Sequence, residues 1–310
     1  MINNIICILF FTFSLNIKVC FYMHRIFIFV ISLVSFCLLN NCSYANGYTK
    51  AVKNNRIAKA QKLNKQNVQK NDNNKKQRTK IVGVIGDRLP NENNQHDYTH
   101  WPIYAMRYQY IDNFAKVCKD NNVAFVMLPD DLSQTDKFIN AVDAIVLTGG
   151  GNDPTGVRDK FEKEILLGVM KQKKQVFGIC RGLQMINLFL GGEIVSLKDT
   201  IKTNENHKQA SYCLTCDKTV HNVNLNQQSK ISKILNVSTV DVNSNHNFIV
   251  GKLADGVIIT GKSPDGVPEV LEMPSYKKYL LAVQWHPEFL ATKYDEMLIK
   301  SFCDAVESNK

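Results

Sequence analysis

"VFGICRGLQMINLFLGG", residues 176–192, places a cysteine between two glycines at the point where an apolar run gives way to a helical pattern. We predict a buried strand that ends at Ile179, a helix that begins at Gly182, and Cys180 at their junction. So tight a turn leaves room only for small residues two positions away, and Gly178 and Gly182 fit there. At a helix N-terminus, unpaired N–H groups and the helix dipole favour a thiolate. An inert buried thiol is the alternative, because cysteine is among the most buried residue types.

Four apolar runs predict a buried sheet around this turn. They are continuous rather than alternating in hydrophobicity, as is typical of parallel strands covered on both faces. Apolar residues at helical spacing separate some of them, and this alternation predicts a doubly wound sheet. The predicted strands are residues 80–86, 124–129, 143–151 and 175–180, and the predicted helices are residues 104–121, 158–174 and 294–306.

The C-terminal half has a different pattern. Short β-rich segments follow one another closely, separated by Gly, Asn and Asp, which indicates antiparallel pairing. The segments are HNVNLN (221–226), VSTVDVNS (237–244), GVIITGKSPDG (256–266), VPEVLEM (267–273) and YLLAVQWH (279–286). We therefore predict an α/β fold that is flavodoxin-like and doubly wound, with a mostly parallel sheet and an antiparallel extension in the C-terminal half.

The N-terminal region of this 310-residue chain predicts a targeting segment in residues 1–45. Residues 23–45 have the charged start, apolar centre and small-residue end of a secretory signal peptide. Their apolar run, residues 26–39, is shorter than the roughly 20 residues of a bilayer span, so we expect cleavage and no stable membrane span. An uncleaved membrane hairpin with residues 1–22 is the alternative. We expect an exported or periplasmic protein, or a cytoplasmic one if translation starts elsewhere.

Residues 46–80 predict a disordered basic linker, because they contain almost no large apolar residues and no periodicity. Residues 50–80 carry 11 Lys or Arg and one acidic residue, Asp72, which accounts for the net charge of +10 of the whole chain. A basic segment can bind nucleic acid or an anionic membrane. Without interleaved aromatic residues we interpret it as a solvated spacer, and we expect no nucleic-acid partner. Residues 81–310 then form one domain.

The cysteines do not indicate a disulfide framework. Five of the nine lie in the predicted domain, at positions 118, 180, 213, 216 and 303, and an odd number leaves at least one thiol unpaired within the chain. Cys213 and Cys216 lie between His207 and His221 in an H-x5-C-x2-C-x4-H pattern. This pattern leaves open a zinc site, a local disulfide or an inert loop. We expect an inert loop, and neither a metal nor an organic cofactor.

A second motif supplies the partners that a nucleophilic thiol needs. In "QWHPEF", His286 follows a predicted strand and Glu288 lies two residues further on. A thiol nucleophile requires a general base, and the base requires a group that orients it. A His-Pro turn beside a solvated glutamate is the alternative. Because both motifs follow predicted strands, they are expected at the edge of the sheet where open α/β folds bind ligands.

A third motif, "LTGGG", residues 147–151, ends the preceding strand in bare backbone. Backbone N–H groups there can approach a substrate closely. We predict an oxyanion hole formed by the N–H groups of Gly150 and of Arg181, the residue after the cysteine. A plain glycine turn is the alternative.

In this order, "LTGGG", "GICRGLQ" and "WHPE" closely resemble the class I glutamine amidotransferase superfamily, and the resemblance spans essentially all of residues 81–310. Within it, Arg181, "RDKFE" (158–162) and "LGG" (190–192) are similar to the gamma-glutamyl-gamma-aminobutyrate hydrolase branch. The resemblance implies a catalytic triad of Cys180, His286 and Glu288, oxyanion donors at Gly150 and Arg181, and Gln184 near the substrate.

Two segments depart from that branch. "NDPTGVRD", residues 152–159, is shorter than usual, and "VNSNHNFIV", residues 242–250, has Asn247 where a second histidine is common. His246 in this segment is a candidate substrate-binding residue, with a turn histidine that makes no contact as the alternative. Both departures fall where a substrate pocket is expected, so they affect the identity of the substrate more than the class of reaction.

These observations predict a cysteine-dependent hydrolase that acts on a small gamma-glutamyl amide and releases glutamate. One alternative is a glutaminase subunit that delivers ammonia to a partner synthase, but we find no synthase-like segment in the sequence. A non-catalytic gamma-glutamyl-binding sensor is the other, and the intact triad argues against it. The sequence gives no prediction of oligomeric state.

Overall fold

A computed structural model describes residues 78–89, 103–151, 156–209 and 217–309. These residues belong to the compact unit Gln77–Lys310. The predicted signal peptide and nearly all of the predicted linker lie outside the described residues, as do Cys213, Cys216 and residues 152–155. The described end of the linker is part of the domain, because Arg78 pairs with Asp143 and Lys80 begins the first strand.

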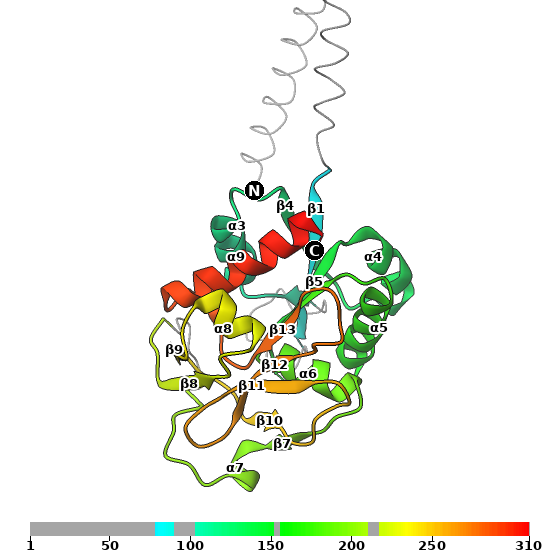
Figure 1. Cartoon of the computed structure of the whole chain (residues 1–310). Helices are drawn as coiled ribbons and strands as arrows, with labels where there is room; N and C mark the ends of the chain where they lie inside the picture. Colours follow the sequence, from blue (N-terminus) through cyan, green and yellow to red (C-terminus); the bar gives the residue numbers. More distant parts are fainter. Residues whose placement is uncertain (1–77, 90–102, 152–155, 210–216, 310) are drawn as a thin grey trace, which may run out of the picture. The chain divides into compact units, whose positions relative to one another are not determined.

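A nine-stranded sheet with the order β4-β1-β5-β6-β13-β12-β11-β8-β9 forms the centre of the unit (Figure 1). The first five strands in this order are parallel, and each later strand is antiparallel to its neighbours. The predicted mostly parallel sheet with an antiparallel extension is confirmed. The strands are β4 (Val123–Leu128), β1 (Lys80–Ile85), β5 (Ala144–Leu147), β6 (Gln175–Ile179), β13 (Leu280–Val283), β12 (Pro268–Glu272), β11 (Ile258–Lys262), β8 (His221–Leu225) and β9 (Thr239–Val242).

The sequence analysis places strand β13 in the antiparallel extension. The structure corrects this in part. Strand β13 pairs parallel with β6 on one side and antiparallel with β12 on the other, so it joins the two parts of the sheet. All four of its residues are buried, which is the pattern of a parallel strand covered on both faces. Its parallel register aligns Val283 with Ile179, so the residues that follow both strands emerge at the same edge.

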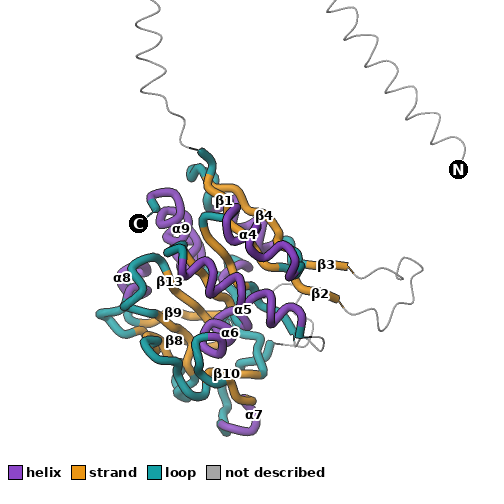
Figure 2. The backbone as a smooth tube through the Cα atoms, turned by 90° about the vertical axis from the view of Figure 1, so that its right-hand side faces the viewer, coloured by secondary structure: helices purple, strands orange, loops and turns teal. Residues whose placement is uncertain are grey.

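Two layers of helices cover the sheet (Figure 1). On one face lie α3 (Gln109–Val117), α8 (Lys230–Leu235) and α9 (Lys293–Ser308), and their apolar residues join one core cluster. On the other face lie α4 (Thr135–Ala141), α5 (Val157–Lys171) and α6 (Arg181–Phe189), with a second cluster. Figure 2 shows α4 and α5 side by side across that face. Because both faces are covered, the strands of the parallel part read as continuous apolar runs.

Several shorter elements were not predicted. Strands β2 (Asp87–Leu89) and β3 (Ile103–Ala105) form a small antiparallel pair, and β7 (Ile194–Ser196) pairs with β10 (Phe248–Val250). The 3-10 turns η1 (Leu132–Gln134) and η2 (Pro287–Phe289) and the short helix α7 (Leu197–Thr200) complete the set. The predicted helix over residues 104–121 is therefore too long: its first residues pair as β3, and α3 begins only at Gln109.

Helix α9 begins with a capping box, in which the Thr292 hydroxyl accepts a backbone N–H and the Asp295 carboxylate accepts the Thr292 N–H. Such reciprocal caps satisfy the N–H groups that the first helical turn leaves free.

Among the described residues, no helix has the length and apolar character needed to cross a bilayer.

A disulfide joins Cys118, at the end of α3, to Cys303 in α9 across 185 residues of sequence. The cysteine count gave no indication of this pair, because only the packing of α3 against α9 brings the two residues together. Cys180 is a free thiol in the same structure. One covalent bond therefore ties α3 to α9, two of the three helices that cover one face of the sheet.

We predict that this disulfide contributes about 2–4 kcal/mol to the free energy of unfolding, because it closes a long loop in the unfolded chain. The double variant Cys118→Ser/Cys303→Ser should be destabilised by this amount in urea denaturation followed by circular dichroism. Dithiothreitol should lower the unfolding midpoint of the unmodified chain to that of the double variant and leave the variant unchanged. Equal midpoints for the oxidised chain and the double variant would contradict the assignment.

Candidate active site

The turn at Cys180 has the strained backbone that the two flanking glycines predict. Cys180 joins β6 to α6 with φ 52° and ψ −106°, a conformation that L residues rarely adopt. A Cβ atom at Gly182 would lie 2.1 Å from the carbonyl oxygen of Leu147, and one at Gly178 would lie 2.6 Å from the Ile186 side chain. A larger residue at 182 would collide with the backbone, and one at 178 would force the Ile186 side chain to move. Glycine at both positions lets the chain reverse and present the thiol.

His286 and Glu288 lie together after β13. The His286 Nδ1 is 2.7 Å from the Glu288 Oε1, and the Glu288 side chain is fully buried. Pro287 begins the 3-10 turn η2, which brings the carboxylate back to the ring of the preceding histidine. With Nδ1 held by the carboxylate, Nε2 is the remaining nitrogen, and it has no hydrogen-bond partner among the described residues.

Gly149 shows how close Cys180 and His286 are. A Cβ atom built on Gly149 would lie 2.9 Å from the Cε1 atom of His286 and 3.5 Å from the Cβ atom of Cys180. Both side chains therefore flank the same point above the end of β5. The structure brings the three predicted residues Cys180, His286 and Glu288 to one place, at the carboxyl edge of the parallel strands.

The electrostatic surroundings favour a protonated His286. Burial alone would lower its pKa, but the Glu288 carboxylate and then the Cys180 sulfur oppose this, and the pKa of His286 is raised well above its ordinary value. A histidine that holds its proton beside a sulfur atom can stabilise a thiolate and later donate the proton to a leaving group.

Asn243 fixes the backbone of His286, a role that the sequence analysis missed. Its side-chain amide donates to the His286 carbonyl oxygen at 2.8 Å, and its side-chain oxygen accepts the His286 N–H at 2.8 Å. Asn243 is buried in the segment after β9. Asn243 is the first asparagine of "VNSNHN", residues 242–247, but only the fold shows that it faces His286.

The glycine loop after β5 is held by Tyr110 of α3. The Gly149 N–H donates to the Tyr110 hydroxyl at 2.8 Å. Burial raises the pKa of Tyr110 well above its ordinary value, and the Glu288 carboxylate adds to this effect. The tyrosine thus stays neutral and can both accept and donate. No hydrogen bond to another described residue engages the N–H of Gly150, the next residue along the loop.

Arg181 offers a backbone N–H to the site, whereas its side chain holds the turn in place through ion pairs. Its N–H is the first of α6 and is not among the backbone donors that are paired within the described residues. Its guanidinium binds the carboxylates of Glu162 and Asp159 on α5. Glu162 also accepts from Arg158, which reaches the Thr148 hydroxyl at 3.1 Å. This buried network ties the cysteine turn to the glycine loop across α5.

Two adjoining cavities open at Cys180. The larger, of about 680 Å³, is lined by Tyr110, Gly149, Gly150, Cys180 and His286 together with residues 105–107, 208, 245 and 247. The smaller, of about 280 Å³, is also lined by Gly150 and Cys180 and adds Arg181, Gln184 and His246. Six of the seven predicted site residues therefore line one or both cavities, and Glu288 is the exception. Glu288 lies behind His286.

The side chains of the two predicted substrate-binding residues are largely engaged elsewhere. The Gln184 amide donates to the Phe248 carbonyl at 2.8 Å and to the Gln284 side chain at 3.2 Å. The His246 ring is 1% exposed, and its Nε2 lies 3.7 Å from Glu269. The ring thus faces Glu269 rather than an approaching ligand, and we do not retain substrate contact by this ring.

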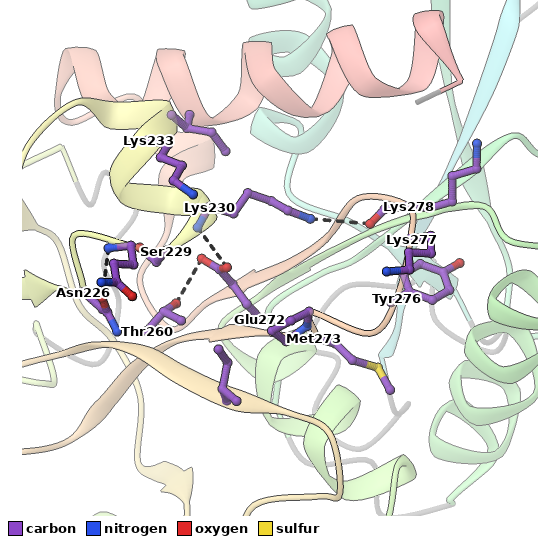
Figure 3. Close-up of a pocket in the computed structure, with 14 residues that line it drawn as sticks. Asn226, Ser229, Lys230, Lys233, Thr260, Glu272, Met273, Tyr276, Lys277 and Lys278 are labelled. Atoms are coloured by element: carbon purple, nitrogen blue, oxygen red, sulfur yellow. Dashed lines mark hydrogen bonds between the residues drawn. The ribbon is translucent and has the colours of Figure 1, made fainter.

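A third cavity, of about 760 Å³, lies away from Cys180 beside α8 and β12 (Figure 3). It contains neither cysteine nor histidine, and its buried acid, Glu272, accepts the N–H groups of Lys230 and Ile231 at 3.0 Å and the Thr260 hydroxyl at 3.1 Å. The carboxylate caps the start of α8, so its partners explain its burial without any chemistry.

Comparison with known proteins agrees with this fold. The glutamine amidotransferase-like protein YvdE of Lactococcus lactis is 28% identical over 224 residues, which cover 67% of this chain and 90% of that protein. The glutamine amidotransferase-like protein RP404 of Rickettsia prowazekii is 27% identical, with coverage of 68% and 91%. The glutaminase domain of Trypanosoma brucei CTPS, solved with bound acivicin, superimposes with a TM-score of 0.50 at 18% identity, covering 75% of this chain and 95% of that one.

Residues 80–288 match the peptidase C26 family, and this stretch runs from the first strand of the sheet to Glu288. It includes the cysteine turn, the glycine loop and the His-Glu pair described above. The chain therefore belongs to the peptidase C26 family.

Proposed function

We propose that this protein hydrolyses gamma-glutamyl amides through a Cys180–His286–Glu288 triad. The observation that carries the proposal is the free thiol on a strained turn, beside a histidine that a buried carboxylate orients at 2.7 Å. Membership in a family with glutamine amidotransferase-like relatives supports hydrolase or amidotransferase activity.

The proposed reaction begins with the proton of the Cys180 thiol already on His286 Nε2, where the raised pKa of the ring holds it, so that the sulfur is a thiolate. The sulfur attacks the gamma-carbonyl carbon, and the N–H groups of Gly150 and Arg181 stabilise the negative oxygen of the tetrahedral intermediate. The C–N bond breaks as His286 returns the proton to the departing amine. Water then loses a proton to His286 and attacks the thioester, which releases glutamate and restores the thiol.

The lining of the larger cavity suits a gamma-glutamyl group. Lys208 and Arg107 are both among its lining residues, and their positive charges complement the alpha-carboxylate that every gamma-glutamyl compound carries. The amide-bearing side chains of Asn245 and Asn247 line the same cavity. These residues do not define the amine half of the substrate, because the side-chain amides of Asn245 and Asn247 can bind many different polar groups.

The second candidate is a glutaminase that passes ammonia to a partner synthase. It is favoured by the similarity to the glutamine-hydrolysing GMP synthase of Dictyostelium discoideum, which is 31% identical over 170 residues that cover 53% of this chain and 21% of that protein. Release of glutamate from glutamine alone, with copurification of a synthase, would select this candidate. Faster turnover of gamma-glutamyl amines, including gamma-glutamyl-gamma-aminobutyrate, would select the hydrolase.

We also propose that the protein is exported. The Cys118–Cys303 disulfide supports this, because disulfides persist mainly in oxidising compartments, and the sequence of residues 23–45 has the pattern of a signal peptide. Mass spectrometry of the protein isolated from its native cell should find a mature N-terminus near Asn46. A chain that retains residues 23–45 in a cytoplasmic fraction, with Cys118 and Cys303 reduced, would contradict the proposal.

We predict that Cys180→Ala and Cys180→Ser each lower kcat for gamma-glutamyl amides by at least about 10³-fold, because neither variant retains the thiol that forms the thioester. Glutamate release by the purified chain measures this effect. Circular dichroism and gel filtration should show the same fold as the unmodified chain. Turnover that survives in both folded variants would exclude Cys180 as the nucleophile.

We predict that Glu288→Gln lowers kcat by about 10²–10⁴-fold, because a neutral amide neither stabilises the imidazolium nor fixes the tautomer. The pKa of His286 should fall, as measured by NMR of the ring nitrogens. The raised pKa of His286 stabilises the fold at pH values below the ordinary histidine pKa, and this contribution is lost as pH rises through the raised value. The variant should therefore be destabilised more at acidic than at alkaline pH. An unchanged histidine titration would contradict the assignment.

A further inference from the structure

Three histidines and a glutamate meet at one buried point beside the smaller cavity. His207 follows α7, His221 begins β8, His246 precedes β10 and Glu269 lies in β12. The Glu269 Oε1 is 3.4 Å from His207 Nδ1, 3.7 Å from His221 Nε2 and 3.7 Å from His246 Nε2. The side chains of all four are at most 1% exposed. We call these four residues the histidine cluster.

Hydrogen bonds on the outer side of each ring define which nitrogen carries the proton. His207 Nε2 contacts the Asp265 carboxylate at 2.9 Å. His221 Nδ1 and His246 Nδ1 each contact a backbone carbonyl oxygen at 3.1 Å. Because carboxylate and carbonyl oxygens only accept, these outer nitrogens are the donors. In a neutral ring the inner nitrogen then carries a lone pair.

The inner atoms of the histidine cluster are therefore all acceptors. The three inner nitrogens and both oxygens of Glu269 have no hydrogen-bond partner among the described residues. A group of buried acceptors that face one another without a donor is costly, and buried polar groups in folded proteins are nearly always satisfied. A cation between them would satisfy the three nitrogens and the Glu269 oxygen that faces them.

His207, His221 and Glu269 offer ligand atoms that all lie within 4.8 Å of one another, a group that could hold a metal ion, and His246 Nε2 lies 3.7 Å from the same Glu269 oxygen. Zinc binds histidine nitrogen and carboxylate oxygen at about 2.0–2.2 Å, which places neighbouring ligand atoms roughly 3.3–3.6 Å apart in a tetrahedron. The separations of the three inner nitrogens from Glu269 Oε1, 3.4, 3.7 and 3.7 Å, approach these values. Asp265 holds the outer nitrogen of His207 as the outer carboxylate of a metal-bound histidine usually does, and its other oxygen accepts from Ser263 at 2.5 Å.

We propose that His207, His221, His246 and Glu269 bind one divalent transition-metal ion, zinc by preference, in a structural site. His207, His221 and Glu269 would supply three ligands, and a shift of the His246 ring toward the ion would complete a tetrahedron with no open position for substrate, as in structural rather than catalytic zinc sites. Two of these histidines flank the H-x5-C-x2-C-x4-H segment, in which we had expected an inert loop. Its cysteines lie outside the described residues, and the other two ligands come from 25 and 48 residues beyond His221.

The site would fix the wall of the cavities at Cys180. Lys208 and Asn245, each next to a ligand, form a β-bridge and both line the larger cavity. The His246 N–H donates to the His207 carbonyl at 2.9 Å, and the Asn245 carbonyl oxygen lies 3.8 Å from the Cys180 sulfur. A bound ion would hold these two loops against each other and thereby position the carbonyl that faces the nucleophile.

Protonation is the competing way to satisfy the cluster. Burial opposes a charge on His207, but Glu269 and Asp265 outweigh it, and the pKa of His207 is raised. Because a proton and a metal ion compete for the same lone pairs, the two states respond in opposite ways to added zinc. A metal site is stabilised by zinc at neutral pH, whereas a protonated cluster is not.

The test is a measurement of metal binding by the purified full chain, which does not depend on turnover. Elemental analysis after expression without chelators should find about one zinc ion per chain. Removal of the ion by a chelator should lower the melting temperature, and added zinc should restore it. Cobalt in place of zinc should give the intense visible absorption of a tetrahedral site. Absence of stoichiometric metal, together with no thermal shift on addition of zinc, would overturn the proposal in favour of protonation.

Two glutamates on β12 provide a matched pair of variants. Glu269→Gln should lose zinc and its chelator-sensitive stability, whereas Glu272→Gln should retain both, because Glu272 binds α8 and Thr260 and lies outside the histidine cluster (Figure 3). If Glu269→Gln does not fold, Asp265→Asn should weaken zinc binding by about 10–100-fold through His207. Zinc affinity equal to that of the unmodified chain in Asp265→Asn and in a folded Glu269→Gln would exclude the cluster as the site.

Discussion

The parallel pairing of β6 with β13 is the constraint on which the site depends. It aligns Ile179 with Val283, so the chain after each strand emerges at the same edge although a hundred residues separate the two. Cys180 comes directly after the first strand, and His286 comes three residues after the second. The backbone hydrogen bonds of the sheet thus set the distance between the Cys180 thiol and the His286 ring, and the side chains around them only adjust it.

Supporting residues then convert this proximity into a defined geometry. Asn243 holds the His286 backbone by two hydrogen bonds, and Glu288 holds its ring. Tyr110 holds the glycine loop, and the Arg158–Glu162–Arg181 network holds that loop against the turn. Each support comes from a different element, so the site is rigid on several sides. This rigidity is what a strained residue such as Cys180 needs in order to persist.

Much of this could be predicted from sequence, because the relevant signals are local. Apolar runs marked the parallel strands, and a cysteine between glycines marked the turn, since both depend on neighbours within a few residues. Roles that depend on contacts between distant segments could not be predicted from the sequence. Asn243 and Tyr110 are polar residues in ordinary surroundings until the sheet brings them to His286 and Gly149. The short strands β2 and β3 carry too few residues for a period to be visible, so the helix at α3 was predicted too long.

The same limit explains the cysteines and histidines. A C-x-x-C segment draws attention to itself, whereas Cys118 and Cys303 are 185 residues apart and have no common motif. Glu269 follows a proline in a β-rich stretch that reads as a plain strand, although its carboxylate faces three imidazoles. Long-range pairs are set by which helices and strands become neighbours, and a single sequence does not show this directly.

The disulfide has a practical consequence for the study of this protein. Thiol-dependent enzymes are customarily assayed with a reducing agent, which keeps the nucleophile from oxidising. Here the same agent would also cut the bond that anchors α3, and α3 carries the tyrosine beneath the glycine loop. A buffer that keeps the Cys180 thiol reduced would therefore also loosen the anchoring of α3, which supports the glycine loop through Tyr110. The concentration of reductant is itself an experimental variable.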